Sequence, residues 1–211
     1  MAKIKTKVVE LKYIFIDGEG RNQERDKTKP ARMQYTASAV MKKDGPEHKA
    51  LLAEIDAEWK AYKDKFSVKG LPDTNGIKDE MMKDPSGAVD PKTEEVAKVS
   101  TGNVVAQFKT NTKWPDGNPQ IVKVFDHKGT DITSAVHAAD WSIGSGSTGI
   151  IHGSAQGNNV GGNHKVTLYL SAVQIARLTK YTGDNVETEE INGDDIDLGD
   201  SVGAIADGPA L

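Results

Sequence analysis

The chain has 211 residues, 36% of them hydrophobic, which suits one domain with additions better than two full domains. It has no cysteine, which excludes disulfides, thiol catalysis and cysteine-based zinc sites. The net charge is −4, and neither a membrane-spanning apolar stretch nor a signal-peptide block occurs, so we expect a protein of the cytosol.

The first half predicts two strands and one helix. Residues 9–16 alternate, with Val9, Leu11, Tyr13 and Phe15 on one face, and residues 32–41 alternate again after a polar loop. Asp44-Gly45-Pro46 then opens a helix over about 47–65. Its apolar face repeats at intervals of three and four residues, and consists of Leu51, Ile55, Trp59, Tyr62 and Phe66. Residues 72–91 are rich in Gly, Asp and Pro, and predict an irregular excursion.

The second half predicts further strands. Residues 104–112 alternate, Pro115-Asp116-Gly117-Asn118 is a strong turn signal, and 121–125 form the return strand. A short strand follows at 149–153, and 165–178 is the longest β-rich segment. Residues after Tyr181 lack periodicity, which indicates disorder.

The end of the chain differs in charge from the rest. No Lys or Arg follows Lys180, so the end carries −9 and the preceding body +5. The nine acids are Asp184, Glu187, Glu189, Glu190, Asp194, Asp195, Asp197, Asp200 and Asp207. Such asymmetry fits a polyanionic partner, and it also fits a solubilising tail.

These elements predict a mainly β protein. About six short strands with one inserted amphipathic helix are typical of the OB fold, a five-stranded Greek-key barrel. The absence of βαβ alternation argues against a doubly wound sheet. We therefore expect an OB-fold domain over 1–183 and a disordered acidic tail over 184–211.

Two motifs suggest chemistry that their context does not support. Residues 144–149 read G-x-G-x-x-G, but the β-like segment that follows cannot place a helix N-terminus at a pyrophosphate. Asp17 and Glu19 could share a Mg²⁺ as in a metal-dependent nuclease, but the further acids and the base that such enzymes need are missing. The five histidines have no metal-ligand spacing. We expect no catalytic residue, metal or cofactor, and hence no enzyme.

Basic, polar and aromatic residues alternate with the apolar ones along the predicted strands. Lys and Arg neutralise phosphates and aromatic rings stack on bases, so this face suits single-stranded nucleic acid. The alternative is an ordinary solvated sheet face. The candidate binding residues are Arg32, Lys109, Asn111, Lys113, Trp114, Lys123, Phe125, Lys165 and Tyr169.

Several segments together resemble the single-stranded-DNA-binding proteins of T7-like phages. They occur in the same order over most of the chain. They are Asn22-Gln23-Glu24-Arg25, Lys42-Lys43-Asp44-Gly45-Pro46, the helix, Phe108-Lys109, residues 121–129, Ile143-Gly144-Ser145-Gly146-Ser147, residues 165–174 and the acidic tail. The resemblance implies an OB fold that binds single-stranded DNA in phage replication, recombination and repair, in the cytoplasm of the infected host.

The resemblance also implies partners. The acidic tail, Asp184 to Asp200 above all, would compete with DNA for the binding face and contact replication proteins such as DNA polymerase or helicase-primase, and a homodimer is suggested.

Three features depart from the family: residues 148–152 lack positive charge, 155–163 lack aromatics, and the chain ends in Leu211 where an aromatic is expected. A phage structural or assembly protein without DNA binding is the alternative, ahead of the nuclease.

Overall fold

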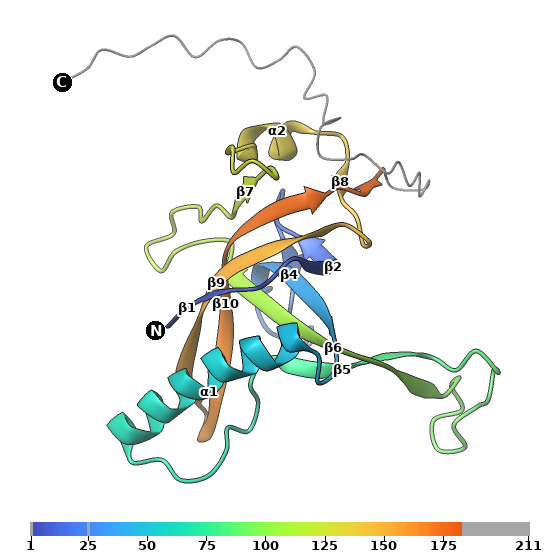
Figure 1. The fold of residues 1–211 in the computed structure, drawn as a ribbon, viewed down its shortest axis with the longest axis vertical. Coiled ribbons are helices and arrows are strands. Elements are labelled where there is room, and N and C mark those ends of the chain that lie inside the picture. Colours follow the sequence, from blue (N-terminus) through green and yellow to red (C-terminus); the bar gives the residue numbers. More distant parts are fainter. Residues whose placement is uncertain (1, 25, 183–211) are drawn as a thin grey trace.

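The computed structural model describes residues 2–24 and 26–182, which form a β-barrel with one long helix against it (Figure 1). The strands are β1 (Ala2–Lys5), β2 (Val9–Phe15), β3 (Arg21–Asn22), β4 (Met33–Lys42), β5 (Ile77–Lys83), β6 (Lys98–Asn111), β7 (Lys123–Phe125), β8 (Ser142–Ile143), β9 (Thr148–Val160), β10 (Asn163–Arg177) and β11 (Lys180–Tyr181). The helices are α1 (Pro46–Phe66) and α2 (Thr133–Ala138). The predicted domain boundary at 183 and the acidic tail lie outside the described residues.

Five strands close the barrel. The pairing runs β2-β4-β6-β10-β9 and returns from β9 to β2, with β6 and β10 parallel and the other pairs antiparallel. Numbered along the chain within the barrel, this order is 1-2-3-5-4-1, a closed Greek-key arrangement. The predicted OB fold is therefore confirmed.

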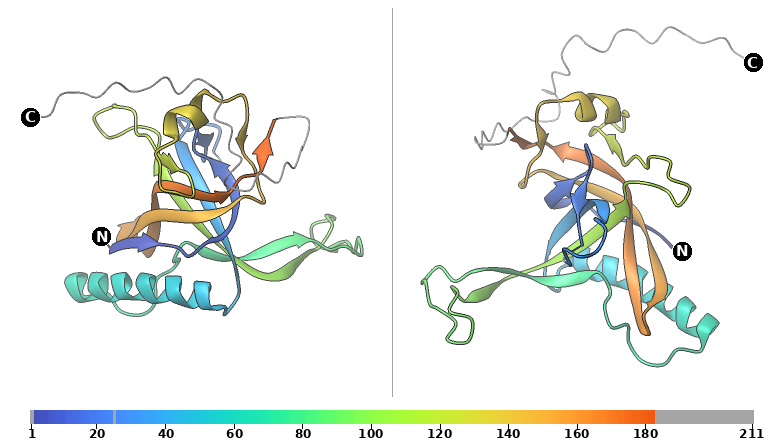
Figure 2. Two further views of the ribbon diagram at one scale, coloured as in Figure 1. Left: turned by 45° about the horizontal axis from the view of Figure 1, so that its top comes forward. Right: turned by 180° about the vertical axis from the view of Figure 1, so that it is seen from behind.

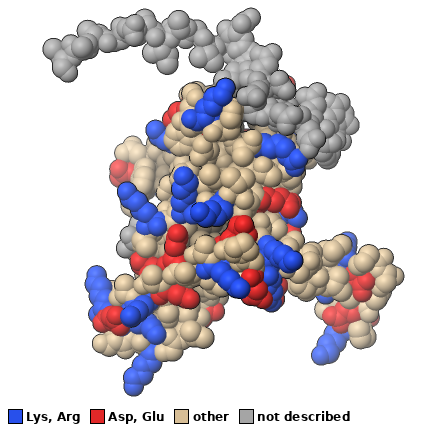
Figure 3. Space-filling view, viewed as in Figure 1, with Lys and Arg blue, Asp and Glu red and all other residues tan. Residues whose placement is uncertain are grey.

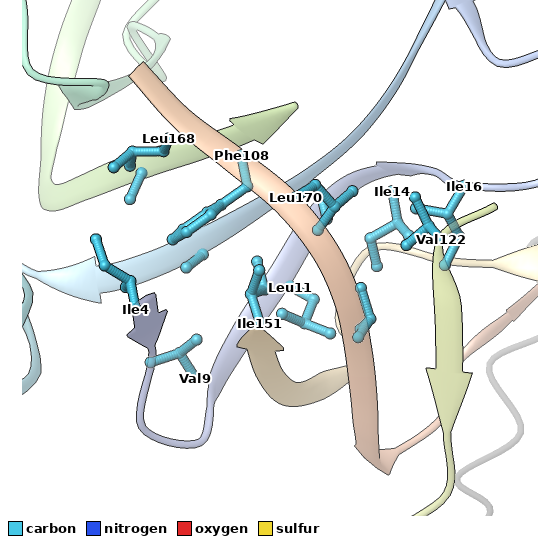
Figure 4. Packing of buried hydrophobic residues seen from close by; sticks show 14 of the residues in the cluster. Ile4, Val9, Leu11, Ile14, Ile16, Phe108, Val122, Ile151, Leu168 and Leu170 are labelled. Atoms are coloured by element: carbon cyan, nitrogen blue, oxygen red, sulfur yellow. The ribbon is translucent and has the colours of Figure 1, made fainter. Parts of the chain in front are cut away.

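The side chains on the inward face of each barrel strand fill the interior of the barrel. Leu11, Phe108, Ile151 and Leu168 are at most 1% exposed and converge in the interior (Figure 4). Gly153 on β9 has a steric role, because a Cβ there would lie 2.1 Å from the Tyr169 carbonyl oxygen and 2.9 Å from the Phe108 ring. A side chain at this position would separate β9 from β10 or displace Phe108.

Helix α1 forms where the sequence predicts it. Pro46 occupies its first turn with Glu47, and Lys63 and Lys65 occupy the last turn, so both ends suit the helix dipole. Four of the five predicted apolar residues are buried, and the helix packs mainly against β9. The fifth, Phe66, is 56% exposed, because the helix ends there beyond the edge of the barrel.

A two-stranded arm corrects the expected irregular excursion. Within 72–91, residues 77–83 form β5, which pairs with the first half of β6, and the two strands project from the barrel (Figure 2). Strand β6 consequently begins at Lys98 and not at residue 104. The excursion is rich in turn residues only around its two ends, and β5 gains its hydrogen bonds from a strand that follows it in the sequence.

The expected return strand is also corrected. The turn at Pro115-Asp116-Gly117-Asn118 forms, with the Gly117 N–H donating to the Trp114 carbonyl at 2.9 Å. The chain pairs back only just beyond β6, where Lys113 bridges Pro119 and the Gln120 N–H donates to the Thr112 carbonyl at 2.8 Å, since β4 lies along one edge of β6 while β5 and β10 occupy the other. Only residues 123–125 become a strand, β7, which pairs in parallel with β10.

A β-bulge reverses the alternation within β2. The register with β4 shifts between Lys12 and Phe15, and Tyr13 has a φ of 52°. An inserted residue moves each following side chain to the opposite face. Ile14 and Ile16 are therefore buried while Tyr13 and Phe15 are exposed. The expectation that Tyr13 and Phe15 share the face of Val9 and Leu11 is wrong.

Among the residues that the structure describes, no helix is long and apolar enough to cross a membrane.

Candidate nucleic-acid interface

A groove in two compartments crosses the outer face of β2, β4 and β6. The arm-side compartment, of about 580 Å³, is lined by Tyr13, Ser38, residues 72–81, Val105, Gln107, Lys109 and residues 165–168. The loop-side compartment, of about 380 Å³, is lined by Tyr13, Phe15, residues 21–24, Thr36 and Gln107. Tyr13 and Gln107 line both, so the two compartments of the groove adjoin each other.

Strand register places side chains in rows across the groove. Phe15 of β2 lies opposite Thr36 of β4, Thr36 lies opposite Lys109 of β6, and Lys109 is level with Tyr169 of β10. An aromatic side chain therefore stands at each end of a row with a lysine between them. A second row, one pleat along, contains Ser38 and Gln107.

Four cations surround the middle of the groove. Burial lowers the pKa of the half-buried Lys109, and the nearby charges of Arg32, Lys165 and Lys78 lower this pKa further. Among the described residues, none of these four side chains has a carboxylate within the 4.0 Å of an ion pair. Their mutual repulsion is relieved by any anion that enters the groove, a phosphate above all.

Tyr13 and Phe15 offer ring faces to the groove. They are 54% and 36% exposed, and the Arg21 guanidinium lies 5.0 Å from the centre of the Phe15 ring. Sequence reasoning missed both residues because it continued the alternation of Val9 and Leu11 through the bulge. The signal was present, since Ile14 and Ile16 put two β-branched apolar residues on the supposedly polar face.

The floor of the groove holds a buried hydroxyl without a partner. Ser38 on β4 is 1% exposed, and its Oγ has no hydrogen bond within the described residues. Buried polar atoms in folded proteins are nearly always satisfied, so an exception needs a cause. Ser38 lines the arm-side compartment, but its Oγ is closed to solvent and so belongs to the packed floor of the groove.

An ion pair fixes the arm beside the groove. Lys12 Nζ lies 2.7 Å from Glu80 Oε1, and Glu80 also accepts hydrogen bonds from Thr101 and Asn103. The Lys12 ammonium holds the pKa of the Glu80 carboxyl below its ordinary value, and this hydrogen bond raises the pKa of Lys12 in turn. The pair ties β5 to β2 and so holds one wall of the groove in place.

Two of the nine residues predicted from the sequence, Lys109 and Lys165, line the groove, and three more, which line neither compartment, lie near Lys109. Lys109 and Asn111 of β6 share one face, Lys165 and Tyr169 lie on the outer face of β10, and Arg32 lies close enough to Lys109 to act on its charge. The Asn111 side chain accepts a hydrogen bond from Gln34 Nε2 at 2.8 Å.

The other four predicted residues line neither compartment. Lys113 and Trp114 lie at the turn beyond the end of β6, where Trp114 is 54% exposed. Lys123 and Phe125 lie on β7 beside the second half of β10, and Lys123 Nζ forms an ion pair with Asp131 at 3.4 Å. These four residues therefore lie outside the walls of the groove.

Charge on the face that carries α1 is mixed (Figure 3). Lysine and arginine side chains alternate there with acidic ones over the helix and the arm (Figure 3). Such interspersed charge gives no continuous positive surface over the helix and the arm on this face.

The two motifs set aside in the sequence have structural roles. Residues 144–147 form a turn that leads into β9 and not into a helix, as expected. Asp17 Oδ2 accepts a hydrogen bond from Ser142 Oγ at 3.0 Å. Within residues 2–24 and 26–182, no group of three or more His, Cys, Asp or Glu side chains is arranged to hold a metal ion.

Known proteins with this fold were found among solved structures, whereas no family model and no curated protein sequence matches the chain. The single-stranded DNA-binding protein gp2.5 of bacteriophage T7 superposes with a TM-score of 0.56 and 15% identity, over 90% of this chain and 99% of that one. The single-stranded DNA-binding protein of bacteriophage Enc34, in complex with single-stranded DNA, superposes with a TM-score of 0.54 and 17% identity, over 90% of each chain. The chain therefore has the OB fold of these two phage single-stranded DNA-binding proteins.

Proposed function

We propose that this protein binds single-stranded DNA without reading its sequence, through the groove on β2, β4 and β6. The observation that carries the proposal is that three cations without an ion pair to any described residue, Lys78, Lys109 and Lys165, line one concave surface together with the outward-facing rings of Tyr13 and Phe15, while Arg32 lies near Lys109. In OB folds this outer face and the loop after the first barrel strand are the usual binding surface for oligonucleotides. The resemblance in fold to two phage proteins with this activity supports it.

Different side chains of the groove contact the DNA backbone and the DNA bases. Lys109, Lys165, Lys78 and Arg32 neutralise phosphates and release counterions, which makes binding steeply dependent on salt. Tyr13, Phe15 and Tyr169 stack on bases, and stacking accepts every base because each has a π-face. Neither contribution needs a catalytic group, so the proposal describes a binding protein and no enzyme.

The acidic tail, residues 184–211, is proposed to act on the same groove. Its charge of −9 makes it a tethered polyanion at high effective concentration, so it competes with DNA for the four cations. Once DNA displaces it, the tail is free to contact replication proteins such as a DNA polymerase or helicase-primase. We place this activity in phage DNA replication, recombination and repair within the host cytoplasm, with the protein acting as a homodimer.

The test measures anisotropy of a fluorescent oligo-dT over a salt series, for the full chain and for a truncation after Gly183. We expect truncation to tighten binding and duplex DNA to compete poorly. We also expect log K to fall with log salt at about −0.7 per phosphate neutralised, hence roughly −3 for four cations. If neither form binds at low salt, the proposal is wrong, and a structural or assembly role takes its place.

Lys109 gives the binding a dependence on pH. Its pKa is lowered from the ordinary 10.5 in the free protein, and a bound phosphate favours the charged form and raises the pKa again. Affinity is therefore full below the lowered pKa and falls as the pH rises through it. We expect this fall below pH 10.5 for the wild type and its loss in Lys109→Arg, which stays charged.

The pH series should use oligo-dA, because thymine itself loses a proton in alkaline solution. Equal pH profiles for the wild type and Lys109→Arg would show that Lys109 does not meet a phosphate.

A further inference from the structure

A second cavity adjoins the groove on the other side of Tyr13 and Phe15. This end pocket has a volume of about 460 Å³ and is lined by residues 13–15, 142–145 and 179–181. Tyr13 and Phe15 also line the loop-side compartment. The two aromatic residues therefore form a partition, and a strand that crosses them reaches both cavities.

The end pocket differs from the groove in its chemistry. Its walls are mainly apolar, with the partly exposed rings of Tyr13, Phe15 and Tyr181. None of the described residues that line it is Asp or Glu, and its one cation, Lys180, has its ammonium 5.2 Å from the centre of the Trp141 ring. Such walls suit a flat group with an apolar face and polar edges better than a phosphate.

The Gly144–Ser147 turn holds one wall of the end pocket rigidly. Ser147 is fully buried, its hydroxyl donates to the Gly144 carbonyl at 2.8 Å, and its Oγ accepts from the Thr179 N–H at 2.9 Å. A Cβ on Gly144 would lie 3.1 Å from the Thr179 carbonyl oxygen, so glycine lets the turn approach β11. The turn leaves Ser145 exposed at the pocket, without a hydrogen bond to any other described residue.

We infer that the end pocket takes one nucleobase of the bound strand. The base would turn over the Tyr13–Phe15 partition, stack against the rings of the pocket and meet the free Ser145 hydroxyl with its polar edge. The phosphates on either side stay in the groove. This inference rests on the proposed function. It gives residues 144–147 a role in binding, whereas phosphate binding alone gives them none.

The test compares two oligomers of equal length at low salt, one with bases and one with abasic sugars throughout. Ser145→Leu fills the pocket without changing a charge. We expect it to weaken binding of the oligomer with bases about tenfold, within the range for one stacked base, and to leave the abasic oligomer and the salt slope unchanged. Ser134→Leu is the matched control, because Ser134 is exposed on α2 and lines neither cavity.

A lowered thermal midpoint of Ser145→Leu would reveal a folding defect. A second pair of variants tests the pocket in that case. Tyr181→Ala should lose affinity only for the oligomer with bases, and Tyr181→Phe should keep it. Unchanged affinity of Ser145→Leu and Tyr181→Ala, or an equal loss with both oligomers, overturns the base pocket while the proposed function stands. Failure of the wild type to bind either oligomer overturns the function and the pocket together.

Discussion

Replacing both Tyr13 and Phe15 by alanine should weaken binding of single-stranded DNA by about 2–6 kcal/mol, since each stacked base contributes about 1–3 kcal/mol. The two rings stand on the partition between the groove and the end pocket, and the bulge in β2 turns both outward. Neither replacement removes a positive charge, so the slope of log K against log salt should stay unchanged. Anisotropy titration of labelled oligo-dT over a salt series measures both quantities.

Phe66→Ala is the matched control for these rings. Phe66 is as exposed as Tyr13, but it lies at the end of α1 and lines neither compartment of the groove. Its removal should leave the affinity within a factor of two. If the double variant binds as tightly as the wild type, the strand does not cross the bulge of β2, and the site must lie elsewhere on the barrel.

Phe108→Ala should lower the free energy of unfolding by about 3–5 kcal/mol, the usual cost of truncating a large buried aromatic. Phe108 is fully buried at the centre of the barrel, and it packs beneath Gly153 where β9 meets β10. Strand β9 also pairs with β2 and so closes the barrel. The cavity left by the truncation would therefore lie beside the strand that closes the barrel. Urea unfolding followed by tryptophan fluorescence or circular dichroism measures the change.

Val160→Ala serves as the control for stability. Val160 is 54% exposed at the tip of the β9–β10 hairpin, and its truncation should change the free energy of unfolding by no more than about 0.5 kcal/mol. A small loss for Phe108→Ala would mean that the barrel collapses around the missing ring, and that the core does not depend on Phe108.

Local sequence patterns identified the parts of the chain whose structure depends on near neighbours. The helix at 46–66 follows from the spacing of Leu51, Ile55, Trp59 and Tyr62, since residues three and four apart share a face. The outward positions of Lys109, Lys165 and Tyr169 follow from period-two alternation within strands that contain no bulge at those points. These features need no knowledge of which strand pairs with which.

Features that depend on pairing were missed. Strand β5 has little alternation and is a strand only because β6 supplies its hydrogen bonds. Residues 121–125 could not form a hairpin with β6, because β10, from later in the sequence, occupies that edge. Tyr13 and Phe15 were placed on the face of Val9 and Leu11, which is wrong because a single inserted residue, visible only in the register with β4, reverses the phase of β2.

The sequence by itself determined the mainly β fold, the long helix, the basic character of the body and three of the cations beside the groove, Arg32, Lys109 and Lys165. Only the tertiary structure decided that Lys78 joins them, that two aromatic rings face the same groove, and that a separate pocket opens behind those rings. The physical reason is that alternation and helical spacing are local, whereas a groove is made by the register between strands distant in the sequence.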